Sequence, residues 1–229
     1  MRLSVVVPTL DEASGIEAQL AALAPLRARG AEVIVADGGS RDGTPALARP
    51  LADAVLTAPR GRASQMNAGA EAASGDVLLF LHADTLLPPD ADRLVADALA
   101  GGPEWGRFDV AIEGSHPLLR VVARAMNLRS RLTGIATGDQ AIFATAETFR
   151  AVGGYADLPL MEDIALSRAL KRRSRPACLS AKATTSGRRW ETRGVVRTIL
   201  TMWRLRAAFF LGADPRRLAA AYGYRPGDA

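Results

Sequence analysis

The first hundred residues alternate short apolar runs with longer amphipathic segments. The apolar runs are rich in valine, leucine and isoleucine, which is typical of strands buried in a parallel sheet. They occupy residues 3–8, 31–37, 54–59 and 76–84. The amphipathic segments predict helices over residues 15–30, 44–52, 61–75 and 88–102. This order of elements predicts an α/β fold with a largely parallel central sheet and helices on both faces.

The pattern becomes more mixed after about Gly101. Alternating residues predict a strand over 105–114, and a second apolar run predicts another over 140–146. Helical spacing predicts one helix over 117–132 and another that begins at about Glu162. We therefore expect one continuous domain over residues 1–190, made of an open α/β half (1–100) and a mixed half (101–190).

The segment 192–215 is amphipathic and basic, within a helical extension that we expect over 191–229. Two interpretations are open. Its apolar side can pack on the domain or form a homodimer while the arginines face solvent, which we favour because core helices have the same pattern. Alternatively, the helix lies on an anionic membrane.

The composition limits the chemistry that this chain can carry out. The lone Cys178 excludes an intramolecular disulfide and a cysteine zinc cluster, and two histidines, His82 and His116, exclude a histidine-rich metal site. Any metal is therefore held mainly by oxygen atoms, which favours Mg²⁺ or Mn²⁺.

The net charge of +5 does not by itself indicate a partner. All the basic residues except Lys171 and Lys182 are arginines, which we interpret as a GC-rich coding bias. The arginines are scattered and no aromatic platform accompanies them, so we do not expect nucleic-acid binding. The residues 1–13 do not resemble a secretory leader, and no apolar stretch approaches the roughly 18 residues of a membrane span. We expect a cytoplasmic protein, with peripheral contact at the inner membrane face under the second interpretation of the extension.

Polar residues follow the end of each predicted parallel strand. In open α/β sheets, ligands bind beyond these carboxyl ends. Carboxylates can hold a cation there, and arginine can neutralise a diphosphate. The strand ends carry Pro8, Thr9 and Glu12; Asp37 and Gly39; Arg62; and His82 and Asp84. Each group taken alone can be a turn or a helix cap, but together they predict a site for a metal-bound, phosphate-bearing ligand.

Glu162 and Asp163 begin a predicted helix and have two interpretations of their own. Acidic residues in a first helical turn are favoured by the helix dipole, so they can serve as a plain cap. The same helix end can instead keep a carboxylate ionised for chemistry.

Five motifs together resemble a known family. "VVVPTLDEA", "ADGGSRDGT", "GRASQMNAGA", "LLFLHAD" and "GGY…MEDIALSRAL" occur in the order of the blocks of family 2 glycosyltransferases with the GT-A fold. The resemblance covers about residues 3–190. It is particularly similar to a bacterial subgroup described as radical-SAM/selenodomain-associated transferase 2.

The resemblance implies a role for each matching residue. It implies nucleotide binding for Pro8, Thr9, Glu12, Asp37, Gly39 and Arg62. Asp84 matches the last acid of the metal-binding "DxD" motif, but His82 replaces the first acid, which leaves the choice between Mn²⁺ and Mg²⁺ open. Asp163 matches the general base of inverting members, and Glu162 would orient it or the acceptor.

Further residues are candidates on the acceptor side. Asp139 and Gln140 lie in a polar loop that can also be a simple turn. Arg189 and Trp190 match an Arg-Trp pair of some processive relatives. The expected activity is therefore transfer of a sugar from a UDP- or GDP-sugar to an acceptor hydroxyl on a small molecule or a lipid-linked one.

Two rival functions remain open at this stage. A sugar-1-phosphate nucleotidyltransferase would carry a Gly-rich, basic loop after the first strand, where this chain has "PTLDEA". A non-catalytic nucleotide-sugar-binding protein would not need Asp84 and Asp163.

Overall fold

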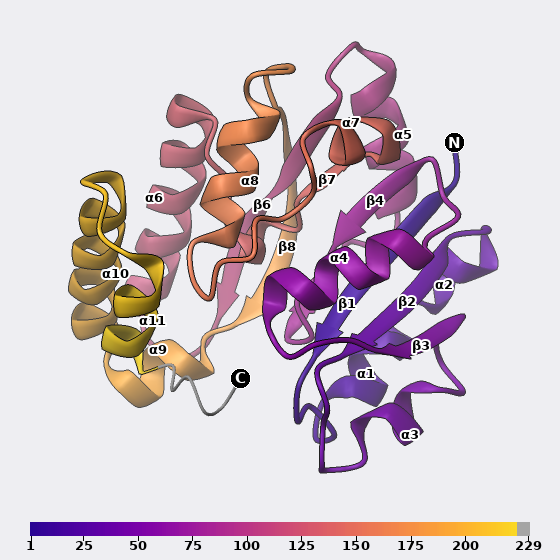
Figure 1. The fold of residues 1–229 in the computed structure, drawn as a ribbon, viewed down its shortest axis with the longest axis horizontal. Coiled ribbons are helices and arrows are strands. Elements are labelled where there is room, and N and C mark those ends of the chain that lie inside the picture. The colour runs from indigo at the N-terminus through magenta and orange to yellow at the C-terminus, as the bar shows by residue number, and fades with distance from the viewer. Residues whose placement is uncertain (224–229) are drawn as a thin grey trace.

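The structure is a computed structural model, and it describes residues 1–223. Within these residues, eight strands form one sheet in the order β3-β2-β1-β4-β7-β6-β8-β5 (Figure 1). Four neighbouring strands of the first half are parallel, as the sequence predicts. They are β1 (Leu3–Thr9), β2 (Glu32–Asp37), β3 (Ala54–Thr57) and β4 (Val77–Phe80).

The second half makes the sheet mixed, in agreement with the change of pattern after Gly101. Strand β7 (Phe143–Thr145) is antiparallel to β4 and to β6 (Trp105–Glu113). Strand β8 (Ala177–Ser186) runs parallel to β6 and antiparallel to the short β5 (Thr85–Leu86). Sequence reasoning missed β8 because most of its residues are small or polar and most are only partly buried, so they show no clear apolar alternation.

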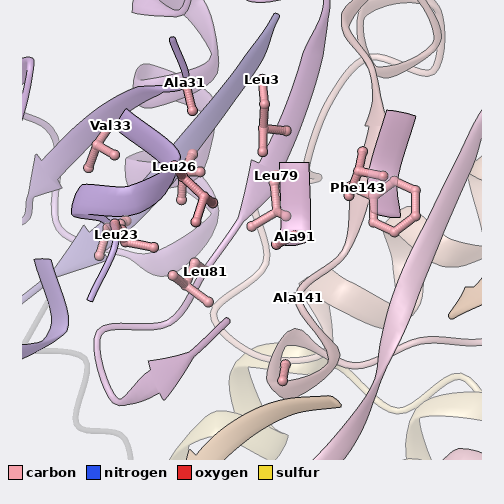
Figure 2. Packing of buried hydrophobic residues seen from close by; sticks show 14 of the residues in the cluster. Leu3, Leu23, Leu26, Ala31, Val33, Leu79, Leu81, Ala91, Ala141 and Phe143 are labelled. Carbon is pink, nitrogen blue, oxygen red and sulfur yellow. The ribbon is translucent and has the colours of Figure 1, made fainter. Parts of the chain in front are cut away.

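Helices cover both faces of the sheet, because successive residues of each strand point to opposite sides. Val5 and Val7 face the side with α1 (Ile16–Ala21), α2 (Ala24–Ala28) and α5 (Ala91–Ala100), which Figure 2 shows from close by. Val6 faces the side with α4 (Arg62–Ala72), α7 (Ala146–Ala151) and α8 (Glu162–Leu170).

Two predicted helices of the first half are shorter than expected. The segment 15–30 forms α1 and α2 instead of one helix, since Pro25 lies in the first turn of α2 and cannot donate a backbone hydrogen bond to a preceding turn. Helix α3 (Thr44–Ala48) ends before Pro50, although helix was predicted up to residue 52. The residue before a proline is disfavoured in helical conformation.

The predicted helix over 117–132 is present as α6 (Leu118–Thr133). A 3₁₀ turn, η1 (Gly138–Gln140), lies between α6 and β7. The basic segment 192–215 is not one continuous helix. Gly194, with φ of +84°, separates α9 (Arg188–Arg193) from α10 (Val195–Phe210), and α11 (Pro215–Tyr222) follows.

One side of these last helices packs on the domain. Leu205 and Leu218 belong to one buried cluster with Ile135 and Ile164, while Val195 and Ile199 pack with α6. This agrees with the favoured interpretation of the extension, although Leu200 and Trp203 of α10 remain exposed. Residues 224–229, the end of the predicted extension, lie outside the described residues. None of the helices in residues 1–223 is long and apolar enough to cross a membrane.

Candidate functional site

A cavity of about 740 Å³ opens at the carboxyl ends of β1 and β4, between the two halves of the domain. It also extends along α6 and α10, so the C-terminal helices form part of its wall. Most of the residues that the sequence analysis selected line this one cavity. They are Pro8, Thr9, Glu12, Arg62, His82, Asp84, Asp139, Glu162, Asp163, Arg189 and Trp190.

Asp37 and Gly39 do not line the cavity. The Asp37 carboxylate is buried and accepts hydrogen bonds from the backbone N–H groups of Gly39 and Ser40, each at 2.9 Å. It also accepts one from the Thr9 hydroxyl at 3.2 Å, and Thr9 does line the cavity. Asp37 therefore shapes the loop after β2, and its contact with a nucleotide base stays a prediction.

Gln140 also lies outside the cavity and is fully buried. Its side-chain oxygen accepts a hydrogen bond from the Thr137 N–H at 3.2 Å, and its side-chain amide donates to Asn127 at 3.4 Å. These bonds hold the 3₁₀ turn in place. They favour the interpretation of this loop as a turn. Its residues Gly138 and Asp139 line the cavity.

An ion pair joins the two halves of the domain across the cavity. The Arg62 Nη1 atom lies 3.3 Å from Glu162 Oε1. Arg62 is the first residue of α4, and Glu162 is the first residue of α8. Glu162 is almost fully buried, whereas the Arg62 side chain is 31% exposed and can also meet a ligand. Glu162 thus positions the guanidinium of Arg62.

Asp163 lies beside Glu162 with its carboxylate held at two points. Its Oδ2 atom accepts a hydrogen bond from Gly138 N–H at 3.0 Å, and its Oδ1 atom accepts one from Ile164 N–H at 2.7 Å. Burial, together with the negative charge of Glu162, raises the pKa of Asp163 to about 6. The Gly138 hydrogen bond and Arg62 act in the opposite direction. The sequence-based argument that the helix N-terminus keeps this acid ionised is therefore incomplete, because burial outweighs the helix end.

His82 and Asp139 form a second pair within the cavity. The His82 Nδ1 atom lies 3.4 Å from Asp139 Oδ1. Burial alone would raise the pKa of Asp139, but the hydrogen bond and charge of His82 lower it, helped by Arg62 and Arg189. The other edge of the imidazole packs on Gly138, where an added Cβ would lie 2.3 Å from Nε2. Gly138 therefore contacts both the histidine and Asp163.

Two further carboxylates lie close together at the strand ends. Burial raises the pKa of Glu12, and the negative charge of Asp84 raises it further, while Arg188 and Arg189 oppose the shift. A cation between two such groups would relieve their repulsion. Among residues 1–223, no group of three or more His, Cys, Asp or Glu side chains is arranged to hold a metal ion.

The sequence analysis missed several polar residues that line the cavity, among them Gln65 and Arg129. Gln65 of α4 is buried and donates from its amide to the carbonyl oxygens of Thr9, at 2.7 Å, and Ala36, at 2.9 Å. It thereby fixes the ends of β1 and β2 side by side, and its place on a buried helix face is a detectable signal. The second is Arg129 of α6, which the sequence does not distinguish from the other arginines of that helix.

Residues 4–146 match the model of a protein family described as "Glycosyl transferase family 2". The chain is 36% identical to the "Succinoglycan biosynthesis protein ExoA" of Rhizobium meliloti (strain 1021) over 172 residues, 66% of this chain and 52% of that protein. It is 31% identical over 156 residues to the "Undecaprenyl-phosphate 4-deoxy-4-formamido-L-arabinose transferase" of Pseudomonas fluorescens (strain Pf0-1), covering 60% and 44% of the two chains. The chain thus spans about half the length of these relatives.

Solved structures share the fold. TarS of S. aureus, residues 1–349 in complex with UDP-GlcNAc, has a TM-score of 0.66 at 18% identity, over 81% of this chain and 58% of that one. The mannosyltransferase PcManGT from Pyrobaculum calidifontis, in complex with GDP-Man and Mn²⁺, has a TM-score of 0.62 at 22% identity, over 90% and 60%. The fold predicted from the sequence, the GT-A fold, is confirmed by this likeness.

Proposed function

The chain belongs to glycosyltransferase family 2, and from this premise we propose that it transfers a sugar from a nucleotide-diphosphate donor, a UDP- or GDP-sugar, to a hydroxyl group of an acceptor. One observation carries the proposal. Arg62, Asp84 and Asp163 come from segments far apart in the chain and line a single cavity. TarS with UDP-GlcNAc and PcManGT with GDP-Man are examples of such donors on the same fold.

The donor is proposed to bind at the carboxyl ends of the parallel strands. Thr9 and Glu12 would contact the base and ribose, and Arg62 would form charge-assisted hydrogen bonds with the diphosphate. Two features support this role for Arg62. Its partner Glu162 already holds the guanidinium in the cavity, and its partial exposure leaves it accessible to a ligand.

Asp84 is the proposed ligand of Mn²⁺ or Mg²⁺, with Glu12 as a nearby second carboxylate. The residues fit such an ion because the two carboxylates repel each other in a partly buried place. Since no group of three protein ligands exists among the described residues, the remaining ligands would be diphosphate oxygens and water, which is usual for Mg²⁺. PcManGT was solved with Mn²⁺. When bound, the ion supplies positive charge that stabilises the leaving diphosphate.

Asp163 is proposed to act as the general base of an inverting displacement. The acceptor oxygen forms a bond to the anomeric carbon while the bond from that carbon to the diphosphate breaks on the opposite face. The hydroxyl proton passes to the Asp163 carboxylate. A pKa of about 6 suits this step, because the group is mostly ionised at neutral pH and still accepts a proton readily. Glu162 holds Arg62 and is a positioning residue.

A peripheral contact with an anionic membrane is proposed for the face formed by α6 and α10. These two helices pack side by side (Figure 1), and both expose apolar side chains at helical spacing. The exposed residues are Leu118, Val121, Leu128, Leu132, Val196, Leu200, Trp203 and Phe210. Both helices contain arginines and neither contains an acidic residue, so two copies of this face would repel each other. An anionic lipid surface complements it better than a homodimer.

A thermal-shift screen tests the donor assignment. Melting temperature is measured with UDP, GDP, CDP and their sugars, with and without Mn²⁺. We expect one nucleotide diphosphate to stabilise the protein, more strongly with the ion. Stabilisation by a nucleoside triphosphate and a sugar 1-phosphate, but by no nucleotide sugar, would favour the nucleotidyltransferase alternative.

A further inference from the structure

Arg129 is a partly buried cation, and two of its guanidinium nitrogen atoms make no hydrogen bond within the described residues. Its Nε and Nη2 atoms are buried and have no hydrogen-bond partner there. Burial lowers the pKa of Arg129, and the nearby charge of Arg107 acts in the same direction, while Asp163 and Asp139 oppose it. Leaving buried donors unpaired is costly, and a charged group more so. This cost would be relieved by an anionic ligand.

Two cavities meet at Arg129. It lines the main cavity, and it also lines a second cavity of about 480 Å³ whose walls come from α6, α8 and α10. Arg206 of α10 is likewise shared by both. The second cavity also contains Arg168 and Lys171, and none of the described residues lining it is acidic. Four cationic side chains therefore line the second cavity, and two of them, Arg129 and Arg206, also line the proposed active site.

We propose that Arg129 and Arg206 bind a phosphate group of the acceptor, so that the acceptor is a phosphate ester. This inference rests on the proposed function and specifies the class of its second substrate. A guanidinium fork matches a phosphate in geometry, and a phosphate monoester carries between one and two negative charges at neutral pH, which suits several cations better than one carboxylate does.

The location assigns Arg129 to the acceptor rather than the donor. Its charge interacts with Asp163, the proposed proton acceptor, and it stands on α6 in the second half of the domain. The proposed donor residues Glu12, Arg62 and Asp84 instead follow strands of the first half. A phosphate bound by Arg129 would therefore hold the acceptor on the side from which its hydroxyl attacks.

The same phosphate chemistry has two sources, a soluble ester and a lipid phosphate. Binding is measured by fluorescence of Trp190 and Trp203, which line the cavity, with glycerol 3-phosphate and 1-oleoylglycerol 3-phosphate as the probes, because each carries a free hydroxyl beside its phosphate. Glycerol and 1-oleoylglycerol serve as uncharged controls. We expect at least one phosphate ester to bind about tenfold tighter than its alcohol. Preference for the oleoyl ester would indicate a lipid source, and preference for the glycerol ester a soluble one.

Substitution tests the two arginines directly. Arg129→Gln should weaken binding of the preferred ester about tenfold, whereas Arg150→Gln, an exposed arginine of α7, should leave it unchanged. Arg206→Gln should have the same effect and decides the matter if Arg129→Gln does not fold. Binding of UDP or GDP with Mn²⁺ should be unchanged in both variants.

Three results would overturn the inference. Phosphate esters could bind no tighter than their alcohols, the substitutions could leave ester binding intact, or Arg129→Gln could weaken the nucleotide as much as the ester. The first two leave donor binding untouched, so they are distinguishable from a failure of the proposed function. The last would move Arg129 to the donor side.

Discussion

The backbone N–H of Gly138 donates a hydrogen bond to the Asp163 carboxylate at 3.0 Å. The same glycine packs against the ring of His82, which pairs with Asp139. One residue without a side chain thus sets the positions of the proposed base and of the histidine that replaces the first acid of the metal motif. The turn at Gly138 is therefore a positioning element of the site.

Gly138→Ala should damage the site without unfolding the protein. The new Cβ would lie 2.3 Å from His82 Nε2, so the ring or the turn must move. Displacement of positioned groups by about 1 Å can cost on the order of 100-fold in rate, and we expect donor turnover to fall on that scale. Gly15→Ala is the matched control, since a Cβ there meets no atom within 4 Å. Equal turnover of the two variants would contradict the positioning role.

The rate should depend on pH through Asp163. Since the group must be ionised to accept a proton, kcat/KM should rise with pH through a midpoint near 6. Glu162→Gln removes a negative neighbour that raises the pKa of Asp163, so the midpoint should move to lower pH. A pH–rate profile of wild type and variant checks both points. An unchanged midpoint in Glu162→Gln would show that another group titrates.

Asp163→Asn should abolish transfer while it stabilises the protein. Loss of a general base typically costs about 100- to 10,000-fold in rate, and donor binding should stay intact. In the folded protein the pKa is raised from 3.8 to about 6, so the folded state holds this proton more tightly than the unfolded chain does. The part of the wild-type stability that depends on protonated Asp163 is therefore lost as pH rises through this window. Asparagine carries no charge at any of these pH values, so the variant does not lose it.

Melting temperatures measured below and above that window test the stability part. Asp163→Asn should melt higher than wild type at neutral pH, with a smaller difference at about pH 4. Near wild-type turnover of the variant would exclude Asp163 as the base.

Asp84→Asn should weaken metal-dependent binding of a nucleotide diphosphate. The variant loses the proposed metal ligand, so the gain in affinity that Mn²⁺ gives to wild type should shrink about tenfold or more. Calorimetric titrations with and without the ion measure this gain. Asp97→Asn, an exposed residue of α5, is the control. If Asp84→Asn and Asp97→Asn both keep the full gain in nucleotide affinity that Mn²⁺ gives to wild type, Asp84 is not the metal ligand.

The face of α6 and α10 should bind anionic vesicles. In a flotation assay, wild type should rise with phosphatidylglycerol vesicles at low salt, less so at moderate salt, and not with phosphatidylcholine. Leu200→Glu should abolish flotation, while Leu86→Glu, at an exposed site on β5, should not. Membrane contact would be contradicted if the protein failed to float at both salt concentrations. It would also be contradicted by a stable dimer that Leu200→Glu dissociates.

The first half of the fold was predictable because three of its four parallel strands, β1, β2 and β4, are buried on both faces. Such strands show uninterrupted runs like Val5 to Val7, and their ends could be compared across the parallel sheet. Strand β8 was missed because it carries small and polar residues. The break at Pro25 was missed because the apolar spacing continues across it.

The site residues that could be predicted are those that directly follow a predicted strand. Residues that follow strands, such as Thr9 and Asp84, reach the cavity because the topology brings strand ends together. Arg129 was not predictable, since only packing distinguishes it from the solvent-facing arginines of the same helix. The pKa of Asp163 was not predictable either, because burial depends on neighbours distant in sequence.

The most direct test of the account measures release of UDP or GDP from nucleotide sugars by the purified chain. We predict slow release that requires Mn²⁺ or Mg²⁺, stops when a chelator is added, and is lost in Asp84→Asn. Binding of nucleotide sugars without any release would instead indicate a non-catalytic binding protein and would contradict the proposed transferase.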